Sequence, residues 1–535
     1  MDSLLCGYLR FGKPLEKQSL LFVVDTEATT SGGVQTANPV HAFPRLSSGN
    51  LSTATLTIDW GDGTSTTIPK NTPYDNNYFT DYSTHTYEAP GKYIVTVEAY
   101  DFSSCSFGVN SNTSAAFSKL KLWRDTVISI GPEDAEEYSL PCMKSDFSYA
   151  FASCMKLTKV PFGLFKNNPM ITDFYSVFYF CTALTEIPED LFAYTDKVTN
   201  LSFAFCNCIK LTGPIPEGLF ANNPAVTSFD NIFQQCTELT GPIPEGLFAN
   251  NPAVTSFDST FMQCAGLTGP IPEGLFANNP AVTSFNYTFY ECSGLTGTIP
   301  ERLFANNPDV TSFDNTFVRC TGLSGSIPEG LFANNLAVTS FDSTFMQCAG
   351  LTGSIPENLF ANNTAVTSFD SVFYACYSLA GDIPENLFIH NNEVTSFAGA
   401  FFACRELTGA IPSGLFSSKT KLTSVERVFE GCTGLTGAIP EELFASSPLI
   451  TSFSYVFSEC TGLTAVPKAL FEENINAVTF IKTFYGCSGI TSEVPELWIS
   501  HPDATGAFCY MRCTNAANYV DIPSDWRYGL PITKE

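Results

Sequence analysis

The stretch LTGPIPEGLFANNPAVTSFDNIFQQC, residues 211–236, decides the fold, because nearly the same letters recur many times along the chain. Aligned on its cysteine, the unit reads V-T-S-F-D-x-x-F-x-x-C-x-x-L-T-G-x-I-P-E-x-L-F-x-x-N-x-x and repeats mostly every 28 residues. A unit of this size cannot enclose a core alone, so its apolar residues must pack against those of its neighbours. The sequence therefore predicts a solenoid of about fourteen stacked coils.

Each unit combines two kinds of local pattern. V-T-S-F alternates as a strand does, whereas D-x-x-F-x-x-C places two apolar side chains three residues apart, as on a helical turn. The segment I-P-E-x-L-F-x-x-N carries proline where a helix begins, glutamate against its positive end and asparagine where it ends. We expect a strand, a helical turn, a strand-like corner and a short helix in each coil. The expected N-caps of the helical turns are Asp230, Asp258, Asp314, Asp342 and Asp370.

The repeat resembles a known class. L-T-G-x-I-P-E-x-L-F is similar to leucine-rich repeats, and F-x-x-C-x-x-L-T is similar to the BspA-like surface proteins of bacteria, over residues 140–520. The resemblance implies a β/α leucine-rich-repeat solenoid and, by analogy, a recognition surface. The unit of 28 residues is longer than the BspA-like unit, so the strand boundaries and curvature are not implied.

The N-terminal region has a different pattern. In runs such as TATLTIDWGDGTSTTI and HTYEAPGKYIVTVEAY, apolar and polar residues alternate, and turn residues separate the alternating segments. This pattern predicts an all-β sandwich. Trp60-Gly61-Asp62-Gly63-Thr64, followed by His85-Thr86-Tyr87, resembles the polycystic-kidney-disease (PKD) type of immunoglobulin-like domain, which implies a spacer or adhesion module. The expected division is an N-terminal docking segment (1–17), a PKD/immunoglobulin-like β-sandwich (18–128), the solenoid (129–500) and a C-terminal cap (501–535).

One cysteine recurs at the same position of every unit. The ladder consists of Cys154, Cys181, Cys208, Cys236, Cys264, Cys292, Cys320, Cys348, Cys376, Cys404, Cys432, Cys460, Cys487 and Cys513. In a secreted protein such thiols could form disulfides, but equivalent side chains in a stack point the same way and suit disulfide torsions poorly. We expect a reduced, buried ladder of structural cysteines. The spacing lacks the histidine partners of zinc sites, so we expect no metal site at these thiols.

The position after the repeat phenylalanine varies from coil to coil and often carries an aromatic residue. The candidate ligand-binding residues are Tyr179, Tyr290, Tyr374, Phe402 and Tyr485. Exposed rings would stack on sugars or contact protein. The alternative is that these side chains pack between coils and only fill space.

Composition narrows the chemistry. The four histidines have no catalytic partner motif, and phosphate loops, zinc-protease helices and nucleophile elbows are absent from the sequence, so we expect no enzyme and no cofactor. Calcium bound by the repeated carboxylates is the alternative to helix capping. The formal net charge of −27 repels nucleic acid and anionic lipid. No apolar run is long enough for membrane insertion.

These observations predict an exterior structural and adhesion protein. The first residues, MDSLLCGYLRFGKPLEKQSLLFVVD, lack the pattern of an export signal. A phage virion protein reaches the outside without one, so we expect a head or tail component on the virion surface. Its N-terminal region would contact virion structural proteins, and its solenoid would bind a host-surface or mucus glycan or protein. The alternative is a bacterial cell-surface leucine-rich-repeat adhesin whose signal peptide was removed.

Overall fold

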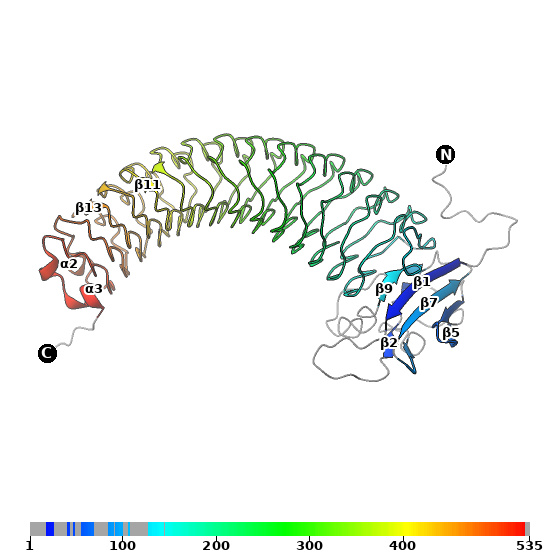
Figure 1. Ribbon diagram of the computed structural model, residues 1–535. Helices are drawn as coiled ribbons and strands as arrows, with labels where there is room; N and C mark the ends of the chain where they lie inside the picture. Colours follow the sequence, from blue (N-terminus) through cyan, green and yellow to red (C-terminus); the bar gives the residue numbers. More distant parts are fainter. Residues whose placement is uncertain are drawn as a thin grey trace. The chain divides into compact units, whose positions relative to one another are not determined.

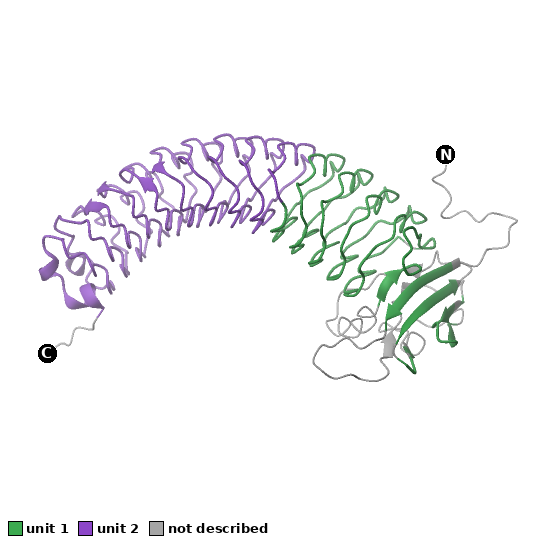
Figure 2. Ribbon diagram, viewed as in Figure 1, with its two compact units in different colours: residues 1–267 green, residues 268–535 purple. Residues whose placement is uncertain are grey.

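The computed structural model describes residues 18–25, 40–42, 47–48, 55–68, 84–89, 91–99, 105–106, 127–143 and 145–529. The chain forms two compact units, residues 1–267 and 268–535 (Figure 2). The first unit contains an antiparallel sheet and the first coils, and the second contains the remaining coils and a C-terminal helical segment. The docking segment expected at residues 1–17 lies outside the described residues.

The N-terminal sheet has five antiparallel strands in the order β5-β4-β7-β1-β9 (Figure 1). Two short pairs, β2 with β6 and β3 with β8, accompany it. The strands are β1 Gln18–Asp25, β2 Val40–Ala42, β3 Ser47–Ser48, β4 Leu56–Asp59, β5 Ser65–Ile68, β6 Thr84–Thr86, β7 Lys92–Ala99, β8 Cys105–Ser106 and β9 Val127–Ile130. Leu20, Phe22 and Val97 are buried, because alternate side chains face the same side of a sheet. The PKD-type sandwich stays a prediction.

β9 extends across the boundary expected between residues 128 and 129 and connects the sheet to the first coil. The Gly131 N–H donates to the carbonyl oxygen of Leu21 at 2.8 Å. In return, the Leu21 N–H donates to the Tyr138 hydroxyl at 3.0 Å. The start of the solenoid is therefore hydrogen-bonded to a central strand of the sheet.

The coils within each unit stack through short parallel bridges. The serine of V-T-S-F bridges its equivalent in the next coil, as in the pair Ser312 and Ser340, and a second bridge joins the L-T-G corners. In some coils the corner lengthens into parallel strand pairs, namely β10 Gly381–Asp382 with β11 Leu407–Thr408, and β12 Gly437–Ala438 with β13 Leu463–Ala465. The strand expected at V-T-S-F is reduced to one bridging residue per coil.

The helical turn and short helix expected in each coil are wrong. Between residues 145 and 496 the described chain contains turns in their place. The Thr344 N–H donates to the Phe341 oxygen within the coil at 3.2 Å, whereas the Ser343 N–H donates to the Asp370 oxygen of the next coil at 2.7 Å. A helix would keep both N–H groups within one segment. The alternation places Ser343 in the left-handed region, with φ of 56°.

Phenylalanine columns form the core of the coils. Phe345 is fully buried, and its ring lies 5.8 Å from the rings of both Phe317 and Phe373, nearly parallel to each. Stacks of this kind remove large apolar areas from water and favour one register between coils. The apolar letters of the repeat are therefore buried against their equivalents, as the periodicity predicts.

A column of asparagine side chains crosses the interior beside the phenylalanines. The Asn335 Nδ2 donates to the Phe304 oxygen at 3.1 Å and to the Asn307 oxygen at 2.8 Å, both in the preceding coil. Asparagines that donate in this way are Asn223, Asn251, Asn307, Asn335, Asn363, Asn391 and Asn474. We call this column the asparagine ladder. It supplies partners to buried carbonyls, which is a different role from the helix stop that the sequence predicted.

Lys419 interrupts the asparagine ladder. Its side chain is buried at the ladder position, where the Nζ donates to the Ser417 oxygen at 3.0 Å and lies 3.4 Å from the Asn392 Oδ1. Burial lowers the pKa of Lys419 to about 8. This coil therefore contains an ionisable group, whereas the preceding coil has the amide of Asn391 and the following coil has the hydroxyl of Ser447, which donates to the Lys419 oxygen at 3.1 Å.

The C-terminal segment covers the last coil. It contains α2 Leu497–Ser500, η1 Tyr519–Asp521 and α3 Ser524–Tyr528, all within or next to the cap expected at residues 501–535. Trp526 is buried, and its ring lies 6.1 Å from that of Phe480. Gly506 lies directly against the indole, where an added Cβ would come within 2.0 Å of a ring carbon. The indole thus takes the place of a further coil.

Candidate binding surfaces of the solenoid

The fourteen ladder cysteines are buried thiols outside disulfides. Twelve of these thiols donate to a phenylalanine oxygen of the preceding coil, as Cys348 does to Phe317 at 2.8 Å and Cys376 to Phe345 at 2.9 Å. Burial raises the pKa of the Cys376 thiol to about 12, so it stays protonated at neutral pH. The structural role expected for these thiols stays a prediction. Outside the ladder, Cys142 is disulfide-bonded.

The aspartates expected to be N-caps connect neighbouring coils instead. The Asp342 Oδ1 accepts from the Asp370 N–H at 3.0 Å and from the Ser368 hydroxyl at 2.5 Å. The capping prediction is wrong because the following segment is a series of turns and not a helix. Burial raises the pKa of Asp342, and the neighbouring carboxylates raise it further, although the Ser368 hydrogen bond opposes this. Among the described residues, no group of three histidines, cysteines or acids is placed to hold a metal ion.

We expect Asp342→Asn to raise the free energy of unfolding at pH 7 by about 0.5 to 1 kcal/mol, because the buried charge is removed and the acceptor oxygen remains. Asn286 already accepts the same pair of hydrogen bonds, from Ser312 and Asp314. Because the folded pKa lies above the unfolded value, the wild type becomes protonated and the difference narrows as pH falls through the folded pKa. Urea unfolding at pH 7 and pH 4 measures this difference. The exposed Asp309→Asn is the control, and an equal gain there would contradict the assignment.

A shallow groove of about 1230 Å³ runs along the I-P-E segments of the second unit. Buried isoleucines lie below it, and exposed glutamates line it, namely Glu273, Glu301, Glu329 and Glu357. The Glu329 Oε1 accepts from the Asn358 amide at 2.7 Å, so neighbouring coils hold the carboxylates in place. The glutamates recur because the coil recurs.

The five candidate ligand-binding residues are all half-buried. The structure brings Tyr374 and Phe402 together as stacked rings with centroids 4.1 Å apart. The ring centroids of Tyr290 and Tyr287 lie 5.6 Å apart. Tyr179 belongs to the first unit, and Tyr485 lies near the end of the second. The rings are therefore accessible in part and pack on their neighbours in part, and their role in ligand binding stays a prediction.

Other exposed aromatic residues accompany this column and were missed from the sequence. Tyr287 is 38% exposed and Tyr377 is 42% exposed. Arg405 lies over the Tyr377 ring, with 5.3 Å between the guanidinium carbon and the ring centroid. Both tyrosines occupy positions of the repeat that also vary between coils, which is the signal that could have found them. The surface beside the buried core therefore carries more rings than the one column predicted.

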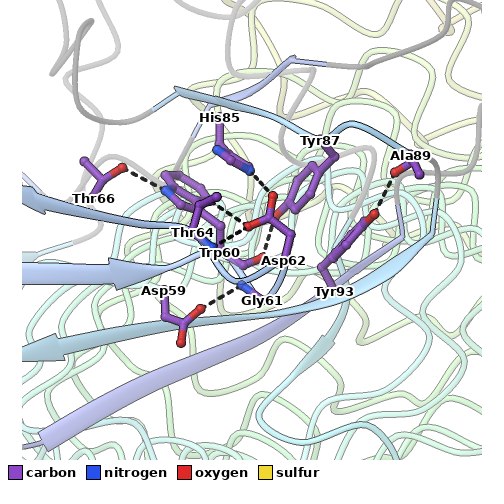
Figure 3. Close-up of polar contacts among 10 residues, drawn as sticks. All are labelled: Asp59, Trp60, Gly61, Asp62, Thr64, Thr66, His85, Tyr87, Ala89 and Tyr93. Carbon is purple, nitrogen blue, oxygen red and sulfur yellow. Dashed lines mark hydrogen bonds and ion pairs between the residues drawn. The ribbon is translucent and has the colours of Figure 1, made fainter.

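The motif of the N-terminal sheet forms a closed polar cluster (Figure 3). The His85 Nε2 lies 2.6 Å from the Asp62 Oδ2, and the imidazole stacks on Trp60 with centroids 4.8 Å apart. The Tyr87 hydroxyl donates to the Trp60 oxygen at 3.1 Å. Burial raises the pKa of Asp62, but hydrogen bonds from Thr64 and His85 outweigh it and hold the pKa below its ordinary value. Since these contacts occupy the polar atoms, the cluster stabilises the hairpin.

Comparison with known proteins gives one family match. The family described as "Mycoplasma protein of unknown function, DUF285" matches residues 146–269, 172–302 and 222–330. No curated protein sequence is significantly similar to this chain. None of the helices that the structure describes is long and apolar enough to cross a membrane.

Solved structures with some similarity contain leucine-rich repeats or receptor ectodomains. The Arabidopsis receptor kinase HAESA ectodomain, in complex with the peptide hormone ligand IDA, is 18% identical over 61% of this chain and 64% of its own, with a TM-score of 0.28. The Drosophila Toll–Spatzle complex is 16% identical over 52% and 45%, with a TM-score of 0.22. The APL1 leucine-rich repeat domain is 12% identical over 58% and 71%, with a TM-score of 0.28.

The chain spans less than two thirds of the length of the HAESA and Toll chains. Its own coils, with their parallel bridges and buried leucine and phenylalanine columns, make it a solenoid of leucine-containing repeats.

Proposed function

We propose that this chain is a non-enzymatic exterior protein whose solenoid adheres to a protein or glycan on a host surface or in mucus. The observation that carries the proposal is the contrast between a uniform core and a varied surface on the same coil. Phe345 and Phe373 occupy one buried column, whereas the positions that follow them carry Met346 and Tyr374. Near-identical coils would offer several weak sites side by side, and simultaneous engagement multiplies weak affinities.

We place the protein on a phage virion, with its N-terminal region against virion structural proteins. The family match to a Mycoplasma protein favours the second candidate, a bacterial cell-surface adhesin. Mass spectrometry of purified phage particles and of cell envelopes from the native source separates the two. Recovery with particles supports the virion component, and recovery only in the envelope supports the adhesin.

We expect the intact chain to be retained on mucin-coated beads and Tyr290→Ala to be retained roughly five-fold less, because a flat contact face is lost. Since Tyr290 is only half-buried, the thermal unfolding midpoint of the variant should stay close to that of the wild type. Tyr194→Ala removes another partly exposed tyrosine, from the first unit, and serves as the control. Equal retention of the two variants would show that Tyr290 is not part of the adhesive surface. Failure of the wild type to bind would refute the adhesive role.

A further inference from the structure

Cations gather near the C-terminal end of the second unit, although the chain as a whole is acidic. Between residues 213 and 401, Arg302 and Arg319 are the only lysines or arginines in the sequence. Among the coils that follow, Arg427, Lys482 and Arg512 all lie over aromatic rings. The local chemistry of this end therefore differs from the rest of the solenoid.

Most of these cations and rings occupy one position of the repeat. The equivalent residues of four successive coils are Arg427, Tyr455, Lys482 and Phe508. Their backbones are left-handed, with φ between 54° and 62°. In earlier coils the same position carries small residues such as Ser343, Ser371 and Gly399, with isolated aromatic residues at Phe203 and Tyr287. Arg427 to Phe508 is the run in which large residues occupy it in four successive coils. Bulky residues are uncommon in this region because of steric cost, so the coil itself does not require them.

Lys482 lies at the centre of these rings. Its Nζ is 5.2 Å from the Tyr455 centroid, 5.3 Å from that of Tyr485 and 6.0 Å from that of Phe508. Arg427 lies 4.1 Å from the Tyr455 centroid, and Arg512 lies 5.2 Å from that of Tyr485. We call these six residues the cation–aromatic cluster. It presents rings and cations in alternation along the stack.

The charges of the cluster are not all neutralised within the protein. Arg427 forms an ion pair with Glu430 at 2.7 Å, and Arg512 approaches Glu459 at 3.9 Å. Within the described part of the chain, the Lys482 ammonium has no ion pair within 4.0 Å and donates no hydrogen bond. It attracts the Glu430 carboxylate without an ion pair, and its other neighbours are ring faces, which stabilise a cation but leave its N–H donors available. The Lys482 ammonium can therefore donate hydrogen bonds to an anionic ligand.

We propose that the cation–aromatic cluster binds a saccharide that carries a carboxylate or a sulfate ester. The apolar face of a sugar ring would pack on Tyr455 or Tyr485, and the anionic group would receive a charge-assisted hydrogen bond from Lys482. The net charge of −27 opposes long polyanions at a distance, which favours short glycans with one acidic group. This inference rests on the proposed adhesive function and names the class of glycan and its site.

The test is isothermal titration of the full chain with sialyllactose, sulfated lactose and neutral lactose. We expect at least one acidic sugar to bind more tightly than lactose. The sugar that binds identifies a carboxylate or a sulfate as the preferred group. Lys482→Gln should weaken this binding by about ten-fold, because a hydrogen bond to a charged group is lost. Lys482→Arg keeps the charge and should retain most of the affinity.

Lys468→Gln is the matched control, because Lys468 is exposed, pairs with Glu493 at 2.8 Å and lies outside the cluster. Equal binding of lactose and both acidic sugars, or full affinity in Lys482→Gln, would overturn the inference. If the acidic sugars fail while the chain is still retained on mucin, the site assignment falls and the adhesive function stands. If mucin retention is also absent, both fall.

Discussion

Asn335→Leu is expected to lower the free energy of unfolding by about 2 kcal/mol, because two buried hydrogen bonds are lost and each contributes about 1 kcal/mol. Each carbonyl keeps one backbone donor, the N–H of Asn307 or of Val310. The acceptors are the backbone oxygens of Phe304 and Asn307 in the preceding coil. Leucine has the same branched shape and the same number of side-chain heavy atoms as asparagine, so the substitution removes the amide without leaving an empty space. Urea unfolding followed by circular dichroism measures the change.

The adjacent Asn334 offers a matched control. Its Nδ2 also donates to the preceding coil, to the Ala305 oxygen at 2.9 Å, but its side chain is exposed to water. Asn334→Ala should therefore cost no more than about 0.5 kcal/mol, because water replaces the lost donor. A similar loss in both variants would mean that burial of the amide is not what makes the asparagine ladder stabilising.

Lys419→Asn is expected to have the largest opposite effect and to stabilise the protein by about 2 kcal/mol at pH 7. The substituted amide would donate to the oxygens of Phe388 and Asn391, as its equivalents do in other coils, and each hydrogen bond contributes about 1 kcal/mol. The variant also removes a buried ammonium. A higher midpoint in urea at pH 7 is the expected observation.

The pH dependence separates these two causes. The folded pKa of Lys419, about 8, lies below the ordinary value of 10.5, so the folded state disfavours the ammonium. The wild type should gain stability relative to Lys419→Asn as pH rises from about 8 to about 10.5, because both states then contain the neutral amine. Lys421→Asn, which removes an exposed lysine paired with Glu393, should show no such change. An advantage of Lys419→Asn that is equal at pH 7 and pH 10 would assign it to the hydrogen bonds alone.

The candidate surface could be predicted only in part. The variable column after the repeat phenylalanine was visible in the sequence, and it includes Tyr485. The rings and cations around Lys482 come from coils 26 to 28 residues apart, and their proximity depends on the register in which shortened coils stack. Alignment on the ladder cysteines places Arg427, Tyr455, Lys482 and Phe508 at one position of the repeat, so the sequence contained a signal for their proximity. The direction of the Lys482 side chain toward three rings is shown only by the tertiary structure.

The sequence by itself determined the period, the stacking of coils and the identity of the buried leucine and phenylalanine positions, because only equivalent neighbours can bury a repeated apolar residue. The tertiary structure alone decided that the coils are built from turns. Apolar residues three apart suit a helix and a series of turns equally, and the choice depends on whether the Ser343 N–H bonds within its coil or to Asp370. It also decided which asparagine of each pair is buried. Asn334 and Asn335 are the same residue type, and only the position of the preceding coil leaves one side chain in water and places the other beside buried carbonyls.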